Sequence, residues 1–351
     1  MPKRRLVQPH GLYGPALECY RKALAVEPAF ALAHYNEARI LLLQGDFAPG
    51  WAKYEWRWQV EGFAKVPPRF PQPRWQGQDL GAGTLLLHAE QGLGDTLQFC
   101  RYIPLAAARA RILLSVPPPL IRLLRSLPGI AAFLRPGEPV PPFEHYCPLL
   151  SLPFVFQTRM ATIPAEIPYL SAEPAVVAAW AQRLPQAICR VGIVWQGSAD
   201  TPFGHGRSLP LAAFAPLARV PGVALISLQK GAGTEQLEAV DGTLAIVSLG
   251  ADFDSGPDAF IDTAAVLMHL DLVITCDTAV AHLAGALGRP TWLLLRRWPD
   301  WRWQLEREDS PWYPSLRLFR QSRLDDWAEV MARVAASLGE FSAARPGRAP
   351  A

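Results

Sequence analysis

The run over 272–290 combines residue types that together can bind a phosphate group. It opens with a short apolar, partly β-branched stretch that predicts a buried strand, and Asp277-Thr278 then breaks this strand before an Ala- and Leu-rich helical stretch. A strand that enters a helix through such a turn gathers backbone N–H groups, a hydroxyl and the positive end of a helix dipole at one point. His282 follows Thr278 by about one helical turn, so it can face the same ligand. We predict an anion site here; the alternative, that Asp277 and Thr278 only cap the helix and His282 is a half-buried polar residue, stays open.

A second turn of similar build lies far upstream, at 91–96. It follows a short apolar stretch at 84–90, and residues 97–110 after it predict a helix that is kinked at its proline. Gly94 lets the backbone approach a ligand closely. Asp95 would be exposed at the helix start. A Gly-Asp pair before a helix is also ordinary capping chemistry, so this turn is a weak signal by itself.

These two turns need a scaffold that brings them to one place. Strand-like and helical segments alternate over 84–172 and again from about 190 onward, which predicts an α/β protein with parallel sheets and right-handed crossovers. Because open α/β sheets bind ligands outside the carboxyl ends of their strands, two Rossmann-like units facing one cleft would bring both turns together. The predicted strands are 84–90, 111–116, 190–195, 223–229, 244–249, 272–276 and 291–295, and the predicted helices after the first are 118–127, 211–219, 234–240, 258–270, 278–287 and 325–338.

The N-terminal residues show a different pattern, which is a repeat of residue types. Within 14–62, positions match at an offset of 34 residues: Ala16, Tyr20, Ala23 and Pro28 with Gly50, Tyr54, Arg57 and Gly62. This period resembles that of tetratricopeptide repeats. One and a half repeats cannot hide their own apolar faces, so we predict that this segment docks on the first sheet unit.

Composition excludes several classes of protein. The 34 Lys and Arg against 31 Asp and Glu give a net charge of +3, and the basic residues are scattered, so no nucleic-acid partner is expected. The 5 cysteines are widely spaced, which favours reduced thiols in a cytoplasmic protein. No apolar run is long enough to span a bilayer, although peripheral attachment to an inner membrane stays open. Asp252-Phe253-Asp254 has the spacing of a metal-binding pair, but its loop setting favours a solvated turn, and we expect no metal and no cofactor.

The two turns, together with Arg207-Ser208-Leu209-Pro210 and Ser227-Leu228-Gln229-Lys230-Gly231 between them, resemble the heptosyltransferase-type glycosyltransferases of family 9. The resemblance is closest to members that tetratricopeptide repeats precede, and it covers residues 84 to about 338. It implies a GT-B-like fold, in which two Rossmann-like domains face a cleft, preceded here by a short α-helical tetratricopeptide-like segment. It also implies a reaction that needs no metal.

The resemblance assigns roles to residues. It places the general base at Asp95. Two positions depart from the family's pattern: Ala279 stands where the family often has glycine, and Arg207 stands where lysine is usual, so a forked cation replaces a point charge. The donor-binding residues that it implies are Gly94, Gly197, Ser198, Arg207, Asp277, Thr278, Ala279 and His282.

The resemblance also suggests domain boundaries. We predict a tetratricopeptide-like helical segment at 1–62, a Pro- and Gly-rich linker at 63–83, an N-terminal Rossmann-like acceptor-side domain at 84–172, a C-terminal Rossmann-like nucleotide-sugar-binding domain at 173–322, a C-terminal helix at 323–340 and a disordered tail at 341–351.

The expected function is metal-independent, inverting transfer of a sugar, hexose or heptose, from a nucleotide-diphosphate sugar to an acceptor hydroxyl. One carboxylate would deprotonate the acceptor, while cations, N–H groups and a helix dipole would stabilise the leaving diphosphate. The acceptor would be a glycan, a lipid-linked sugar or a protein, and the repeats would offer a surface for a protein partner. Two alternatives stay open: a non-catalytic, repeat-containing interaction or scaffold protein with a degenerate transferase domain, and a protein O-glycosyltransferase.

The segment 298–303 places three tryptophans around Asp300 and Arg302. Indole rings there could stack on a sugar or a base. Aromatic clusters more often serve cores, so we predict that this segment packs the crossover between the two domains.

Overall fold

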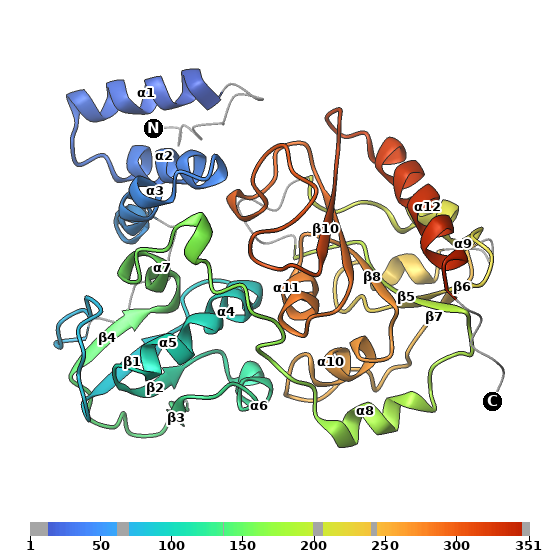
Figure 1. Cartoon of the computed structure of the whole chain (residues 1–351), viewed down its shortest axis with the longest axis horizontal. Helices are drawn as coiled ribbons and strands as arrows, with labels where there is room; N and C mark the ends of the chain where they lie inside the picture. The colour runs from blue at the N-terminus through green and yellow to red at the C-terminus, as the bar shows by residue number, and fades with distance from the viewer. Residues whose placement is uncertain (1–12, 62–69, 136, 199–205, 240–243, 346–351) are drawn as a thin grey trace.

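The computed structural model describes residues 13–61, 70–135, 137–198, 206–239 and 244–345. Figure 1 shows them as a stack of N-terminal helices above a first sheet unit, with a second sheet unit beside both. The predicted α/β fold with two parallel sheets is confirmed.

The N-terminal stack consists of α1 (Tyr13–Val26), α2 (Ala31–Leu43) and α3 (Phe47–Tyr54), followed by the 3-10 helix η1 (Glu55–Gln59). Helix α2 lies in the middle, and ten of its 13 residues are buried, including the charged Glu37 and Arg39. A helix that is buried on nearly all sides needs neighbours on every face. Here α1 and α3 supply two of these neighbours, and the second sheet unit supplies another.

The first sheet contains β1 (Thr84–His88), β2 (Arg111–Ser115), β3 (Ile130–Phe133) and β4 (His145–Pro148) in the parallel order β3-β2-β1-β4. Its central strands read as continuous apolar runs because a parallel sheet is covered on both faces. The helices of this unit are α4 (Leu93–Phe99), α5 (Ile103–Ala107), α6 (Ile121–Leu124) and α7 (Leu152–Val155), with the 3-10 helices η2 (Cys100–Tyr102), η3 (Pro118–Leu120), η4 (Leu149–Ser151) and η5 (Met160–Thr162).

The second sheet is also parallel, in the order β10-β9-β8-β5-β6-β7. Counted within the unit, this is the 3-2-1-4-5-6 order of a Rossmann fold, whose switch point lies between β5 and β8. Its strands are β5 (Cys189–Val194), β6 (Val223–Ser227), β7 (Ile246–Val247), β8 (Leu272–Cys276), β9 (Thr291–Leu295) and β10 (Leu316–Arg320). Its helices are α8 (Pro174–Ala181), α9 (Ala215–Ala218), α10 (Ile261–Leu267), α11 (Ala279–Ala286) and α12 (Trp327–Ala343), with the 3-10 helices η6 (Leu211–Phe214), η7 (Thr234–Leu237) and η8 (Trp301–Trp303).

Several predicted elements differ from the structure. The helix expected over 97–110 already begins at Leu93 and breaks at η2, and Pro104 lies in the first turn of α5, where a missing N–H costs nothing. Strands β3, β4 and β10 were not predicted, since the first two lie beside a Pro-rich stretch and the third follows an aromatic loop. The helices expected at 211–219 and 234–240 are partly or wholly 3-10.

The predicted linker at 63–83 is wrong in its second half, while 62–69 lie outside the described residues. Trp75 is fully buried, and its backbone N–H donates to the Tyr146 carbonyl at 2.9 Å, so this segment packs along the first sheet. At the other end, α12 runs through Ala343 and thus includes the first residues of the predicted tail 341–351. The ring of Phe341 contacts Trp292 at 5.7 Å, which explains why the helix continues; 346–351 are not described.

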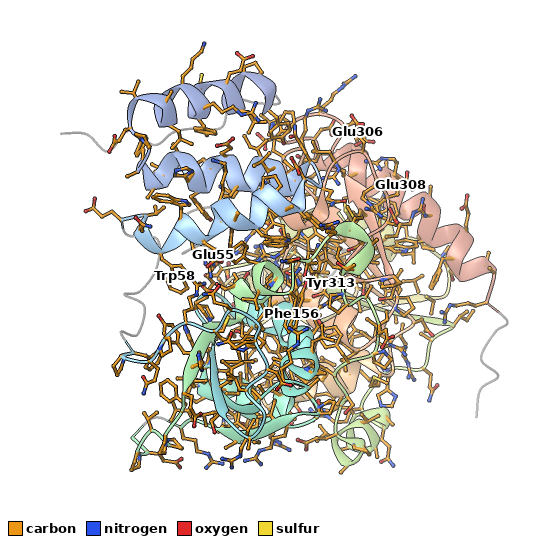
Figure 2. All side chains as sticks on the ribbon, turned by 60° about the vertical axis from the view of Figure 1, so that its left-hand side comes forward. Glu55, Trp58, Phe156, Glu306, Glu308 and Tyr313 are labelled. Carbon is orange, nitrogen blue, oxygen red and sulfur yellow. The ribbon has the colours of Figure 1, made fainter. Side chains whose placement is uncertain are left out.

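The N-terminal helices dock on the first unit, as predicted, and on the second unit as well. Arg57, with no exposed side-chain surface, forms an ion pair with Glu90 at 2.7 Å and donates to the Ser151 hydroxyl at 2.7 Å. Trp51 donates to the Thr158 carbonyl at 3.0 Å and contacts the ring of Trp301 in the second unit at 5.2 Å. Figure 2 shows Glu55 and Trp58 at the boundary between these helices and the first sheet unit.

The buried Arg57–Glu90 pair yields a stability prediction. Arg57→Leu should lower the free energy of unfolding by about 3–5 kcal/mol, because it leaves the Glu90 carboxylate buried without its cation. Urea unfolding followed by tryptophan fluorescence measures this loss. Arg333→Leu is the matched control: its i,i+4 pair with Glu329 is exposed, so the change should stay within about 0.5 kcal/mol. A loss below about 1 kcal/mol for Arg57→Leu would show that water solvates Glu90.

Candidate functional site

The turn after β1 leads directly into α4. Gly92 is the N-cap of this helix, so Gly94 and Asp95 lie in its first turn. The Asp95 carboxylate accepts a hydrogen bond from the Gly92 N–H at 2.9 Å, and its side chain is 20% exposed. Asp95 is therefore a helix cap, as the simpler interpretation holds, but its second oxygen faces an arginine of the other sheet unit.

The turn after β8 leads directly into the start of α11. Thr278 is the N-cap of α11, but its side chain makes no capping hydrogen bond and instead bonds the Thr275 hydroxyl at 3.0 Å. Asp277 is partly buried beside this helix start. Burial and the nearby negative charge of Asp300 raise the pKa of Asp277 to about 6, although Trp303, Arg207 and Arg302 oppose the shift.

His282 lies one turn into α11 and is buried. Its Nδ1 forms a hydrogen bond with the Tyr313 hydroxyl at 2.9 Å, and its ring stacks on Trp303 with centroids 5.4 Å apart. Burial, together with the positive charges of Arg302 and Arg101, lowers the pKa of His282 to about 3. The imidazole is therefore neutral at physiological pH and can act as a hydrogen-bond donor or acceptor but not as a cation.

The two turns meet, as predicted. A Cβ atom on Gly94 would lie 2.9 Å from Cδ2 of His282 and 3.3 Å from the Cα of Ala279, so a larger residue would push α4 away from α11. The methyl group of Ala279 faces Gly94 in this contact, so the alanine at this position packs against a glycine across the boundary. The carboxyl ends of β1 and β8 thus face each other.

The loop after β5 adds a cation. The Arg207 guanidinium lies over Gly197, with its Nε 2.9 Å from where a Cβ on that glycine would be, and its Nη2 donates to the Ser198 carbonyl at 2.9 Å. The Gly197 N–H donates to the Ser208 hydroxyl at 3.2 Å. Ser198 is exposed, and residues 199–205 after it are not described. Arg207 also lowers the pKa of Asp277, which places the β5 and β8 ends within electrostatic reach of each other.

Sequence reasoning missed the charged residues of the tryptophan-rich segment. Trp301 and Trp303 are buried, so the packing interpretation of this segment is confirmed. Between them, Arg302 forms ion pairs with Asp300 at 2.8 Å and with Asp95 across the boundary between the units. Two opposite charges inside an apolar run were a usable signal, because charges enter a protein interior in pairs.

Arg296, directly after β9, also belongs to this site. It is partly buried, which lowers its pKa, while the negative charges of Asp277 and Asp300 act in the opposite direction. Arg207 and Arg296 therefore lie within electrostatic reach of Asp277 around the start of α11, whereas Arg302 is engaged by Asp95 and Asp300. Such an arrangement can neutralise a bound diphosphate without moving the backbone.

In the described residues, no three His, Cys, Asp or Glu side chains are grouped to hold a metal ion. Asp252 is 65% exposed and pairs with Arg183 at 2.8 Å, as expected of a solvated turn, whereas Asp254 accepts from the Asp262 N–H at 2.9 Å and bonds Thr263. The second aspartate thus has a structural role at the start of α10. None of the helices in the described part is long and apolar enough to cross a membrane.

Comparison with known proteins connects this geometry to a family. Residues 256–320 match the model of glycosyltransferase family 9 (heptosyltransferase), a range that includes β8, α11, β9 and η8. The fold is similar to the structure of E. coli ADP-heptose lps heptosyltransferase II, with a TM-score of 0.53 and 14% sequence identity. The similarity covers 74% of this chain and 98% of the E. coli chain. The chain has the fold of a family 9 glycosyltransferase. The resemblance drawn from the motifs is confirmed at this level, while the tetratricopeptide assignment stays a prediction.

Two further similarities are more limited. Protein FlbA of Caulobacter vibrioides is 29% identical over 351 residues, which cover 89% of this chain and 56% of FlbA. The chain thus spans about half the length of this relative. A family 9 glycosyltransferase from Veillonella parvula DSM 2008 has 11% identity and a TM-score of 0.49, with 78% of this chain and 93% of that chain covered.

The raised pKa of Asp277 makes stability depend on pH. Its carboxyl ionises near pH 6 in the folded protein and near pH 4 when unfolded. The contribution of Asp277 to the free energy of unfolding is therefore complete below about pH 4 and is lost as the pH rises through about 6. Asp277→Asn should remove this loss, so that the variant gains about 1–3 kcal/mol relative to wild type between pH 4.5 and 7.5. Urea unfolding at four pH values measures this difference, and a constant difference would contradict the assignment.

Proposed function

We propose that this chain is a metal-independent, inverting glycosyltransferase that moves a sugar from a nucleotide-diphosphate sugar to an acceptor hydroxyl. The observation that carries the proposal is the contact between the two strand-end turns. Asp95 of the first unit lies across the α4–α11 contact from the start of α11 in the second unit. A general base and an anion site on opposite sides of one boundary are what transfer of a glycosyl group requires.

The second unit supports binding of the donor's diphosphate. The N-terminus of α11 offers backbone N–H groups, and Arg207 and Arg296 lie beside it. Arginine side chains can hold a diphosphate bidentately, so positive charge is available from the chain itself. The neutral His282 can add a hydrogen bond but no charge. These groups support a reaction in which the leaving diphosphate needs no metal ion.

The first unit supports the base. The Asp95 carboxylate is partly exposed, and each of its oxygens has acceptor sites beyond the hydrogen bonds that it already makes. Asp277 and Asp300 lie on the donor side, where Asp300 is held by Arg302. Glu90 of the first unit is engaged by Arg57, which leaves Asp95 as the base, and direct displacement by the deprotonated acceptor then inverts the anomeric centre.

The comparisons support a substrate class. One solved structure of this fold is named for ADP-heptose and lipopolysaccharide, which supports a nucleotide sugar as donor and a glycan or lipid-linked sugar as acceptor here. A protein is the alternative acceptor, and a protein partner would bind the N-terminal helices. The proposed site of action is the cytoplasm, on or off the inner membrane surface. A scaffold that retains the fold without turnover is the competing function, and the Asp95 experiment below separates the two.

The donor side is tested by charge removal. Arg207→Gln should weaken the binding of nucleoside diphosphates at least tenfold, because it removes one cation beside the α11 start. Isothermal titration calorimetry with ADP, GDP, UDP and CDP measures binding, and a melting curve checks folding. Arg219→Gln, an exposed arginine of the same unit, is the charge-matched control. Unchanged affinity in Arg207→Gln would remove this residue from the donor site.

The base is tested by Asp95→Asn, which keeps an oxygen to cap Gly92. We expect unchanged nucleotide affinity and a turnover that is lower by about 10²–10⁴-fold, the usual contribution of a general base. Turnover is followed by release of nucleoside diphosphate from the donor found by calorimetry. A loss well below tenfold would reduce Asp95 to a helix cap, and wild-type binding without any turnover would favour the scaffold function.

A further inference from the structure

We propose that Arg302 is a positioning residue for Asp95, and that the N-terminal helices hold Arg302 in the place where it does this. The inference rests on the proposed function, since it takes Asp95 as the base. It assigns to the helical segment a part in the catalytic site itself.

The contacts of the Arg302 guanidinium fix its orientation. Its Nη2 donates to the Asp95 carboxylate, and its Nε donates to the side chain of Gln98, which follows Asp95 on α4. Its Nη1 donates to the Asp300 carboxylate at 2.8 Å. Each nitrogen of the planar group thus has a partner, two of them in the first sheet unit and one in the second, so the group cannot rotate without breaking several bonds.

The surroundings of Arg302 exclude water. The residue is 7% exposed, and its guanidinium lies 4.4 Å from the centroid of the Trp301 ring and 5.6 Å from that of Phe99. A buried arginine is stable only where acceptors surround it, and two of the acceptors of Arg302 are carboxylates. The same bonds that neutralise Arg302 therefore hold the Asp95 side chain in one direction.

The N-terminal helices fix the segment that carries Arg302. Trp301, the first residue of η8, contacts the rings of Trp51 at 5.2 Å and Tyr54 at 6.0 Å, both in α3. Asp300 caps η8 by accepting from the Arg302 N–H at 3.2 Å. Arg39 of α2 also lowers the pKa of Asp300, so its charge reaches this cap. The position of η8 thus depends on helices that precede both sheet units.

These contacts hold the Asp95 carboxylate in a fixed orientation. One oxygen of Asp95 accepts from Gly92 and the other from Arg302, so the carboxylate is held from both sides of the unit boundary. A base must lie within hydrogen-bond reach of the proton that it removes, and a misplacement of about 1 Å can cost about 10²-fold in rate. Loss of Arg302 should therefore lower kcat and leave the KM for the donor sugar nearly unchanged.

The experiment uses the full chain and compares Arg302→Gln and Arg302→Lys with Asp95→Asn and with the double variant Asp95→Asn/Arg302→Gln. We expect Arg302→Gln to lower kcat about 10–100-fold with a donor KM within about twofold of wild type. Arg302→Lys, which keeps the charge but not the fork, should recover part of the rate. In the Asp95→Asn background, Arg302→Gln should cause no further loss of kcat, because the residue acts through Asp95. Arg307→Gln, in the same loop and paired with the exposed Asp309, is the control.

Three outcomes would overturn the proposal. A donor KM that rises with unchanged kcat would make Arg302 a donor ligand. A further loss of kcat in the double variant would show that it does not act through Asp95. A lysine variant no better than glutamine would remove the role of the charge.

Melting temperatures of wild type, Asp95→Asn, Arg302→Gln and the double variant give a readout that needs no turnover. Asp95→Asn and Arg302→Gln should be non-additive there, because the two side chains are in contact. If wild type transfers no sugar while the melting temperatures are non-additive, the function proposed above fails and the contact between the residues stands. Additive melting temperatures contradict the positioning role itself.

Discussion

Buried arginines join the first sheet unit of this molecule to the N-terminal helices and to the second unit. Arg57 links the N-terminal helices to Glu90 of the first unit, and Arg302 links the second unit to Asp95. Arg101 donates to the Trp312 carbonyl and lies 4.4 Å from the Tyr313 ring, so it ties the first unit to the second at another point. Removing a guanidinium from water is costly, and only carboxylates, carbonyls and ring faces offset that cost. At each junction, the buried guanidinium has all of its partners in one arrangement only. This requirement specifies the positions of the units relative to one another.

The same junctions hold the two strand ends of the candidate site in place. Because the start of α4 contacts α11 at Gly94 and is bonded to Arg302 nearby, the two strand ends cannot slide past each other without breaking an ion pair. Figure 1 shows the N-terminal helices beside the boundary of the two sheet units, above α4 and α11. These helices contact both sheet units, since Trp51 contacts the Trp301 ring of the second unit and donates to the Thr158 carbonyl of the first. The helical segment is thus a structural part of the sheet units and not a separate appendage.

Local patterns were enough to predict the two turns and the alternation of strands and helices. Asp277-Thr278 and the Gly-x-Gly-Asp turn are encoded within a few residues, because capping and backbone approach are local effects. Contacts between distant segments could not be read in this way: Arg302 and Asp95 are 207 residues apart, and no period connects them. Strand β4 was missed for a related reason, because it reads as His-Tyr-Cys-Pro and becomes a strand only by pairing with β1.

Under the proposed function, the charges around the start of α11 serve both the structure and the binding of a diphosphate. Arg207 and Arg296 lie within electrostatic reach of Asp277, and Arg302 is engaged by Asp95 and Asp300, so each guanidinium has a carboxylate within reach in the protein itself. Under the proposed function, a diphosphate would compete with Asp277 for Arg207 and Arg296. Asp300 is held by Arg302 and stays ionised, since its pKa is lowered. Asp277 has a pKa raised to about 6, so it can take up a proton at little cost when negative charge arrives. Asp300 therefore maintains the structure, and under the proposed function Asp277 is the carboxylate that a bound diphosphate would displace from Arg207 and Arg296.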